Sequence, residues 1–535
     1  MQKKLTGVLV SIMAVLIGCI VLLAAVPPVS RDALIHHLAV PKLWIRHGGI
    51  YEIPDMVFSY YPMALDVLYA IPLYFGNDIV PKYIHFAFAL ATAWLIWNYL
   101  KSRLNSSYAV LGALFFLSTP VIVKLSITAY VDLGLVFFST AGLLCILKWN
   151  EGRTGYRYLI AGGLCCGLAL STKYNGLIVF LMLFLLVAYC SSRGAAAGKH
   201  GQLKVVQHLL IFSAVATALF APWGIKNTVW TGNPLFPLFD SWFNGATPGH
   251  ASSIPPMVLR KVLYGESWWE IVLVPLRIFF QGVDDSPRYF DGKLNPALII
   301  FPLFSILTLK PGKERAEKKI MALFAVMFIL LVFFQTTMRI RYVAPVIPIL
   351  VILSMFGLNN ISGLLGERFS RNNVRIAGVI VLVSVSLMFS TNIRYVIDQF
   401  KVVTPVAYVS GRISRDTYIE RFRPEYAAIK YSNDHLKGDI NILSLFIGGR
   451  GYYIDNETHF DIEPLKSAVM QSGTQGEIGL NLRRLGFTHV LLRRDMFNNW
   501  CHNNLSKEQI GLVADFFKEK GRLLFSKDGH DLYRL

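Results

Sequence analysis

The first apolar stretch of the chain runs for 25 residues, from Leu5 to Val29, without one charged side chain. It is longer than the ~7 to 15 apolar residues of a secretory signal, and it can cross a hydrocarbon core of roughly 30 Å. We interpret it as an uncleaved membrane span. Similar runs follow, so the sequence predicts about eleven spanning helices near residues 5–26, 81–100, 108–123, 128–147, 157–172, 174–190, 206–222, 294–309, 320–336, 342–358 and 375–391.

The composition excludes an ordinary soluble protein. Hydrophobic residues make up 54% of the 535 positions and charged residues only 16%, which leaves too little polar surface to cover a soluble fold. Five of the six cysteines lie in apolar runs, so nothing indicates a disulfide framework. The sequence also contains no Cys/His spacing typical of a metal site and no phosphate-binding loop.

The distribution of basic residues predicts the orientation, because Lys and Arg collect in short cytoplasmic loops. With a cytoplasmic amino terminus, the inner segments hold 18 Lys and Arg against four acidic residues. These segments are 1–4, 101–107, 148–157, 191–205, 310–319 and 359–375. We expect a multi-pass protein of the plasma (inner) membrane, and nucleic acid is not an expected partner, because topology explains most of the net charge of +19.

The same orientation places the bulk of the polar chain on the outer face. We expect a membrane domain over residues 1–391, with outer loops 27–80 and 223–293, and an outward-facing α/β domain over residues 392–535. Interfacial helices are predicted near 31–47, 62–75 and 268–281. In the tail, we predict helices at 424–436 and 507–520, strands at 441–447 and 488–494, and a hairpin at 521–535. The GGRG at 448–451 lacks a dinucleotide-binding spacing and favours a tight turn over a nucleotide site.

Charged residues from four separate turns fall at the outer ends of the predicted spans. They are Asp32, Lys124, Asp132, Lys173, Arg339 and Arg341. Ionisable groups at membrane depth are costly, so they usually face a protein-lined cavity and pair there. A shared site explains all six, although each has a structural alternative: the acids could cap helices, and the cations could reach the headgroups.

His36, Arg339 and Arg341 indicate what kind of reaction the shared site could carry out. His36 is four residues beyond Asp32 and on the same helix face, whereas His37 faces elsewhere. Arg339 and Arg341 stand in a short outer hairpin, which should avoid positive charge. A pair of guanidinium groups at the lipid edge is suited to a membrane-anchored phosphate. Together with carboxylates, it favours transfer of a group from a lipid phosphate to a hydroxyl, as in glycosyl transfer.

At these residues the chain resembles a known family, the polyprenyl-phosphate-dependent membrane glycosyltransferases of the C superfold. The resemblance is to the bacterial branch of relatives of protein O-mannosyltransferases and of the lipid A aminoarabinose transferase. It covers essentially the whole chain and rests on the order and sidedness of several blocks. They are DALIHHLAVPKLWIRHGGIYEIPDMVFSYYPMALDVLYAIPLYFG, STKYNGLIVF, TGNPLFPLF, RIRYVAPVIPIL, IGGRGYYID and LGFTHVLLRRD.

The resemblance implies roles for individual residues. Asp32 matches the acid that ends the first span and acts as general base or helps to place a metal, and Asp132 matches the acid at the outer start of the fourth span. Arg339 and Arg341 match basic residues near the carrier phosphate, and Lys173 matches a lysine on the outer side of the central spans. Lys124, His36 and Tyr342 complete the predicted substrate-binding residues.

Metal dependence is left open by the sequence. Arg31 and Ala33 flank Asp32, whereas the mannosyltransferases and oligosaccharyltransferases carry an acidic neighbour or an Asp-x-Asp-like pattern. Asp32, Asp132 and His36 could hold a divalent cation such as Mg²⁺ or Mn²⁺, and a metal-free base mechanism fits equally well.

We therefore predict an inverting glycosyltransferase that moves a sugar from a polyprenyl-phosphate carrier to a lipid, glycan or protein acceptor. The α-helical polytopic protein would meet both substrates, and membrane lipids, at the outer face of the membrane. Aromatic residues of the second outer loop could contact sugar or lipid, although each is better explained as an interfacial anchor; they are Trp230, Trp242, Trp268 and Trp269. The alternatives are a flippase or transporter of a lipid-linked sugar, a transferase of whole glycans, and a non-enzymatic scaffold.

Overall fold

The computed structural model describes residues 2–152, 155–194, 199–245, 255–307, 313–335, 337–368 and 373–535. Parts of the predicted inner segments 148–157, 191–205, 310–319 and 359–375 lie outside these residues. The chain forms two compact units, which we describe one at a time. The first unit comprises Met1–Ala25, Tyr60–Leu68 and Val80–Pro405, and the second comprises Val26–Ser59, Tyr69–Ile79 and Val406–Leu535. The predicted domain boundary at residue 391 stays a prediction.

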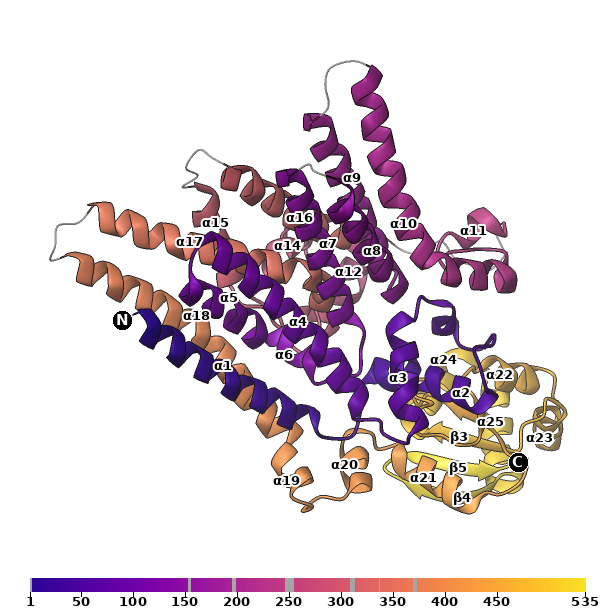
Figure 1. The fold of residues 1–535 in the computed structure, drawn as a ribbon. Coiled ribbons are helices and arrows are strands. Elements are labelled where there is room, and N and C mark those ends of the chain that lie inside the picture. The colour runs from indigo at the N-terminus through magenta and orange to yellow at the C-terminus, as the bar shows by residue number, and fades with distance from the viewer. Residues whose placement is uncertain are drawn as a thin grey trace. The chain divides into compact units, whose positions relative to one another are not determined.

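Helices build the described part of the first unit (Figure 1). They are α1 (Gln2–Ala24), α4 (Val80–Arg103), α5 (Ser106–Ser118), α6 (Pro120–Ser126), α7 (Asp132–Gly152), α8 (Arg157–Thr172), α9 (Gly176–Gly194), α10 (Lys199–Thr231), α11 (Asp240–Phe243), α12 (Pro256–Tyr264), α13 (Trp268–Val272), α14 (Val274–Arg277), η3 (Pro287–Tyr289), α15 (Ala297–Leu307), α16 (Lys313–Gln335), η4 (Ile340–Val346), α17 (Ile347–Arg368) and α18 (Asn373–Val403). A further helix, α3 (Ala64–Tyr74), begins in the first unit and ends in the second.

Each predicted span overlaps one of these helices. In the described part of the chain, five helices are long and apolar enough to cross a membrane: α1, α7, α9, α10 and the continuous run of η4 and α17. The bent pair of α5 and α6 would be a sixth. The protein is therefore a multi-pass membrane protein, whereas the count of eleven spans stays a prediction.

The third predicted span is broken where it meets Pro120. A proline disfavours helical geometry at the residue before it, and Thr119 accordingly has φ −58° and ψ 129°. Helices α5 and α6 meet there at 65°. The break sets the direction of α6, which carries Lys124 in its last turn.

Two glycines allow α8 and α10 to pack closely. A Cβ atom at Gly167 would lie 2.6 Å from the carbonyl oxygen of Ala216, and one at Gly163 would lie 3.1 Å from that of Phe212. Small residues four positions apart commonly permit such close approach in membranes. This contact fixes α8, and so the position of Lys173 directly after it.

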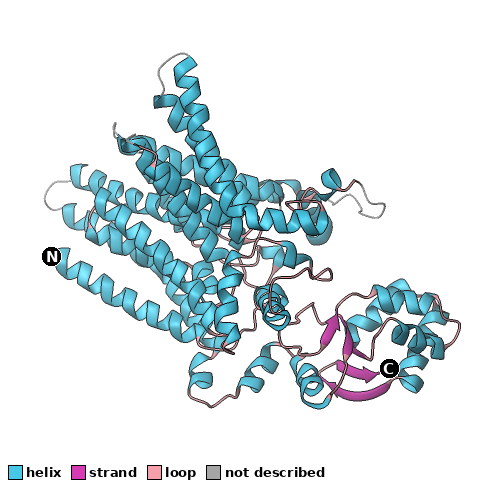
Figure 2. Cartoon of the chain, turned by 45° about the vertical axis from the view of Figure 1, so that its right-hand side comes forward, coloured by secondary structure: helices cyan, strands magenta, loops and turns pink. Residues whose placement is uncertain are grey.

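The second unit contains the strands, drawn in magenta in Figure 2. Its elements are η1 (Ala33–His37), α2 (Ala39–His47), η2 (Val57–Tyr60), α19 (Pro405–Val409), α20 (Arg415–Phe422), α21 (Tyr426–His435), β1 (Asn441–Leu445), β2 (Glu457–His459), α22 (Glu463–Met470), α23 (Gln475–Arg484), β3 (His489–Arg493), α24 (Arg494–Asn504), α25 (Lys507–Asp515), η5 (Phe516–Lys520), β4 (Arg522–Lys527) and β5 (His530–Arg534). The strands form one sheet in the order β2-β1-β3-β5-β4, in which β1 is parallel to β2 and β3, and β5 is antiparallel to β3 and β4.

The sheet confirms the predicted α/β character of the tail. Its central strands alternate as expected, because Leu443 and Leu445 pack into one apolar cluster while Ile442 packs into another. The predicted turn at 448–451 is also confirmed. Gly448 and Gly449 have φ values of 77° and 67°, a backbone region that favours glycine.

Two of the predicted interfacial helices are interrupted. The helix expected at 268–281 is instead the two short helices α13 and α14, which meet at Leu273; Pro275 stands in the first turn of α14. The helix expected at 31–47 is a π-helical turn, η1, followed after Leu38 by α2. The third, predicted at 62–75, is the continuous helix α3.

Within the second unit, the first outer loop is fastened to the IGGRGYYID block by Lys42. Its ammonium donates to the carbonyl oxygens of Tyr452 at 2.7 Å and Ile454 at 2.9 Å, and to Asp455 Oδ1 at 2.9 Å. Burial lowers the pKa of Lys42 despite this pairing. Although burial acts to raise it, the pKa of Asp455 is lowered by the hydrogen bond from Lys42 and by the charges of Lys42 and Arg46. Burial has the larger effect on the pKa of Lys42, whose side chain is only 21% exposed. For Asp455, whose side chain is 56% exposed, the contacts with Lys42 and Arg46 outweigh burial.

Replacing Lys42 by Met should loosen this attachment. The change leaves the carbonyl groups of Tyr452 and Ile454 without this donor, while Asp455 keeps its hydrogen bond from Arg46. Hydrogen bonds to a charged group contribute about 1.5 to 3 kcal/mol. We expect faster hydrogen–deuterium exchange in residues 26–59. Lys430→Met is the matched control, because Lys430 pairs with Asp416 and Asp434 at the surface and should contribute little. Equal exchange in the two variants would contradict the role of Lys42.

Candidate functional site

Asp132 and Lys173 form a buried ion pair in the first unit. Asp132 is the first residue of α7 and is only 2% exposed. Its Oδ1 accepts a hydrogen bond of 2.8 Å from Lys173 Nζ, and Lys173 stands in extended backbone directly after α8. A carboxylate in such surroundings is costly unless a cation compensates it. The pair therefore brings together two of the residues predicted to share a site.

A third segment, η4, adds Arg341 and Tyr342 to this pair. The ring centroid of Tyr342 lies 5.3 Å from Lys173 Nζ and 5.4 Å from Arg341 Cζ. Arg341 also stacks on Tyr130, at 5.2 Å from that ring, and its charge acts on Asp132. We call Asp132, Lys173, Arg341, Tyr342 and Tyr130 the Asp132 cluster. It presents two cations, one carboxylate and two phenol rings at the ends of membrane helices.

His85 holds the backbone before and after Asp132 in place by hydrogen bonds. Its Nδ1 lies 3.0 Å and 2.9 Å from the carbonyl oxygens of Leu125 and Thr128, which can only accept. Nδ1 must therefore carry the proton, and Nε2 accepts from the backbone N–H of Leu133 at 2.8 Å. That N–H belongs to the first turn of α7, where no intrahelical acceptor exists. His85 was not predicted as a site residue, because its role depends on hydrogen bonds to backbone groups far away in the sequence.

Asn227 holds the carboxyl-terminal end of α10 beside the turn that carries Lys173. Its Nδ2 donates to the carbonyl oxygen of Tyr60 at 2.8 Å and to Tyr174 Oη at 3.1 Å. Tyr174 in turn donates to the carbonyl oxygen of Phe236 at 2.7 Å. Three blocks of the sequence thus meet here: the first outer loop, STKYNG and TGNPLFPLF. Asn227 is fully buried, and its sequence context gave no signal of this role.

Lys124 and Arg339 face a different group of acids, which were not among the predicted site residues. Lys124 Nζ lies 3.2 Å from Asp285 Oδ2 and 3.8 Å from Asp284 Oδ2. Arg339 NH1 lies 3.7 Å from Asp291 Oδ2. Asp284, Asp285 and Asp291 belong to GVDDSPRYFDGK, and the concentration of three acids in one short outer stretch was the available signal.

A buried salt bridge fixes the turn that carries both arginines. Arg260 donates two hydrogen bonds of 2.8 Å to Glu266, and its NH1 donates to the carbonyl oxygen of Thr337 at 3.2 Å. Burial acts to raise the pKa of Glu266, but hydrogen bonds and charges from Arg260 and Arg277 hold that pKa below its ordinary value. The backbone two residues before Arg339 is thereby tied to the second outer loop.

Asp32 and His36 lie in the second unit. Asp32 is half-buried and directly precedes η1, where it makes no side-chain cap hydrogen bond. His36 is buried and stacks on Phe58, with ring centroids 4.5 Å apart, while its centroid lies 4.0 Å from that of His37. The general-base role of Asp32 stays a prediction.

Among the described residues, no group of three or more His, Cys, Asp or Glu side chains lies close enough together to hold a divalent cation. Asp132 already shares its carboxylate with Lys173, and Arg341 adds a second positive charge. Both cations oppose a metal at Asp132, so we derive no step through Mg²⁺ or Mn²⁺, and the tentative ligand role of Asp32, Asp132 and His36 stays a prediction.

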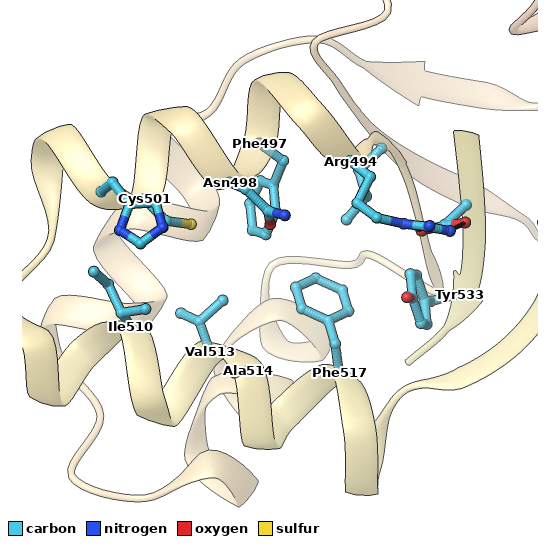
Figure 3. A pocket seen from close by; sticks show the side chains of 12 residues that line it. Arg494, Phe497, Asn498, Cys501, Ile510, Val513, Ala514, Phe517 and Tyr533 are labelled. Atoms are coloured by element: carbon cyan, nitrogen blue, oxygen red, sulfur yellow. Dashed lines mark hydrogen bonds and ion pairs between the residues drawn. The ribbon is translucent and has the colours of Figure 1, made fainter. Parts of the chain in front are cut away.

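A small pocket of about 230 Å³ lies between α24 and α25 in the second unit (Figure 3). Phe497 of α24 and Phe517 of η5, which directly follows α25, supply apolar walls. At one end, Arg494 donates to both carboxylate oxygens of Asp531, at 2.7 Å and 2.6 Å. Burial raises the pKa of Cys501, which also lines the pocket, to about 11, so its thiol is unsuited to nucleophilic chemistry.

Comparison with known proteins agrees with this fold. A family model described as dolichyl-phosphate-mannose-protein mannosyltransferase matches residues 34–227. The crystal structure of ArnT from Cupriavidus metallidurans bound to undecaprenyl phosphate is similar at 12% identity with a TM-score of 0.57, over 99% of this chain and 98% of that one. The same protein in the apo state gives 11% identity over the same shares, also with a TM-score of 0.57.

One further solved structure is similar with a lower TM-score. The Archaeoglobus fulgidus oligosaccharyltransferase in the apo form shows 13% identity over 97% of this chain and 74% of that one, with a TM-score of 0.49. A search of curated protein sequences finds no match.

Replacing Lys173 by Met should destabilise the first unit, because it leaves the Asp132 carboxylate buried without its ion-pair partner. Such losses cost about 3 to 5 kcal/mol. The double variant Asp132→Asn/Lys173→Met should recover much of this loss, since the remaining amide is neutral. The midpoint of thermal unfolding of detergent-solubilised protein measures both effects. Lys124→Met is the control, because Asp285 is 86% exposed and can rely on water.

If the double variant unfolded at no higher temperature than Lys173→Met, the unpaired Asp132 carboxylate would not be the reason for the loss of stability.

Proposed function

We propose that this chain, a membrane glycosyltransferase, transfers a sugar from a polyprenyl-phosphate carrier to a hydroxyl acceptor with inversion at the anomeric carbon. Its resemblance to polyprenyl-phosphate-dependent enzymes of the C superfold is confirmed by the family model and by the fold. The observation that carries the proposal is the Asp132 cluster, in which cations from two turns surround a single carboxylate at the ends of membrane helices.

The cluster has the charge needed for a lipid phosphate. Lys173 and Arg341 together carry two positive charges against one negative charge on Asp132, so the group keeps a net charge of about +1. A guanidinium group can bind two phosphate oxygens at once, and the phenol of Tyr342 can donate to a third. One of the similar solved structures contains undecaprenyl phosphate, which supports a donor of this class for this chain. Arg339 would lie at the edge of the site, where Asp291 shares its charge.

The proposed reaction needs a base and a stabilised leaving group. Asp32 would take the proton from the acceptor hydroxyl, whose oxygen then forms a bond to the anomeric carbon as the bond to the phosphate oxygen breaks. The electron pair of that bond leaves with the polyprenyl phosphate, whose charge Arg341 and Lys173 stabilise. Asp132 is less suited to act as base, because its carboxylate is engaged by Lys173. Its role would be to orient that lysine.

The outer face is the proposed location of this chemistry. In the predicted orientation, α7 and α9 begin at the outer leaflet, so the Asp132 cluster would meet a carrier that enters sideways from lipid. The acceptor would be a lipid, a glycan or a protein on the same side. The second unit, with its own pocket between α24 and α25, would then face the acceptor compartment.

The substrate class and the base are tested together by a panel of labelled polyprenyl-phosphate sugars. Purified protein is incubated with each donor and with membrane extract, and transfer of the label is measured for the native chain and for Asp32→Asn. We expect one donor to be used by the native chain and a loss on the order of 10² to 10⁴ in rate for the variant.

Two different results would reject separate parts of the proposal. Normal transfer by Asp32→Asn would reject Asp32 as the base but keep the activity. If no labelled sugar moved in any combination while the protein carried lipid-linked sugar across vesicles, a flippase would replace the transferase.

The two arginines should differ in importance when each is replaced by Lys. Arg341→Lys keeps the charge but loses the planar two-point fork, so we expect the rate to fall on the order of 10² to 10³, as when one preorganised donor is removed. Arg339→Lys should have a much smaller effect, because Asp291 already shares that charge. Steady-state transfer assays at varied donor concentration measure both. A greater loss in Arg339→Lys would move the phosphate to the acidic loop.

A further inference from the structure

A large apolar groove lies between α9 and α16, away from the Asp132 cluster. Its volume is about 700 Å³, within the range of ligand pockets. The walls are mostly aliphatic and aromatic, with Leu186, Phe324 and Met327 among them. Arg193, Arg315 and Lys319 line the same groove. An apolar groove with cations can bind an amphiphile, whose apolar tail would contact the walls and whose negatively charged headgroup would contact the cations.

The three cations are not neutralised by neighbouring acids in the described part of the chain. The two nearby carboxylates of α16 serve other partners: Glu314 lies 3.4 Å from Lys318, and Glu317 lies 2.8 Å from Arg103. Arg315 and Lys319 are four residues apart and so share one face of α16. Arg193 donates to Tyr189 Oη at 3.0 Å, which is a neutral partner. The groove thus keeps the charge of three cations.

The position of these cations separates them from the proposed donor site. Lys173 lies in the short turn before α9, which begins at Gly176, whereas Arg193 stands in the last turn of that helix. With about 1.5 Å of rise per residue, the two ends of this helix lie roughly 30 Å apart, which is the thickness of the hydrocarbon core. In the predicted orientation, Arg193, Arg315 and Lys319 therefore belong to the inner leaflet.

We propose that this groove is a binding site for an anionic phospholipid of the inner leaflet. The phosphate would bind Arg193, Arg315 and Lys319, and an acyl chain would lie along Leu186, Phe324 and Met327. The site does not depend on the proposed transferase activity, because it uses none of the residues of the Asp132 cluster. Its occupant bridges α9 and α16, so a bound lipid would stabilise the packing of these two helices.

The test measures lipid binding to the full-length protein by native mass spectrometry after delipidation in neutral detergent. Phosphatidylglycerol, phosphatidylcholine and polyprenyl phosphate are added separately. The groove variant is Arg193→Gln/Arg315→Gln/Lys319→Gln. Its matched control is Lys101→Gln/Lys148→Gln/Arg157→Gln, which also removes three predicted cytoplasmic cations. Those three stack on aromatic rings, on Trp97 for Lys101 and on Tyr158 for the other two, and none lines the groove.

We expect the native protein to retain phosphatidylglycerol in preference to phosphatidylcholine. The groove variant should bind phosphatidylglycerol about 10²-fold more weakly, since each cation near an anionic headgroup is worth roughly a factor of five. The control variant should bind it as the native chain does. Leu323→Trp, which fills the groove at a side chain that is 62% exposed and leaves every charge in place, should also weaken binding and guards against misfolding of the triple variant.

Each remaining outcome would overturn the proposal. Equal loss in the groove and control variants would show attraction by the basic surface as a whole. Equal retention of the two phospholipids would show that the headgroup charge is not recognised. Preference for polyprenyl phosphate would assign the groove to the donor's carrier, and unchanged phosphatidylglycerol binding in Leu323→Trp would place the lipid elsewhere.

Discussion

The carboxylate of Asp132 and the ammonium of Lys173 lie 2.8 Å apart at the ends of two membrane helices. A buried carboxylate needs a cation beside it, so the pair requires the start of α7 to lie beside the end of α8. Close packing of α8 against α10 at Gly163 and Gly167 fixes the position of α8. Tyr342 contacts Lys173, so η4 also packs beside this ion pair. The proposed phosphate site is thus a consequence of how one buried acid is neutralised.

Local pattern was sufficient to predict much of the fold. Each apolar run predicted a helix, whereas the bend between α5 and α6 was not predicted, although Pro120 marks its position. In the tail, the short apolar runs NILSLFI and THVLLRR predicted strands at 441–447 and 488–494, and these correspond to β1 and β3. The short strand β2 was missed, because its three residues include no buried member and form no such apolar run. The break after η1 was missed as well, although Pro41, which cannot donate a hydrogen bond to the carbonyl oxygen of His37, was a signal for it.

The site was predictable in type but not in pairing. An acid and a lysine at the ends of neighbouring spans indicated a shared cavity, and Asp132 and Lys173 do meet. The contribution of His85 could not be read from the chain, because a histidine in an apolar run is equally compatible with packing. Asn227 presented the same difficulty. Both are defined by hydrogen bonds to backbone groups far away in sequence, and no local pattern encodes those partners.

Arg339 and Arg341 show why charge position alone is an incomplete guide to binding. They are separated by one residue and were expected to act together, yet Arg339 stands in extended backbone and Arg341 inside a 3₁₀ turn. Their side chains consequently meet different neighbours: Asp291 for the first, and the rings of Tyr130 and Tyr342 for the second. The strength with which a cation can hold a phosphate depends on how much of its charge a carboxylate already shares. Arg341 shares the Asp132 carboxylate with Lys173, so the Asp132 cluster keeps a net positive charge for the proposed lipid phosphate, whereas Arg339 faces Asp291 of the acidic loop.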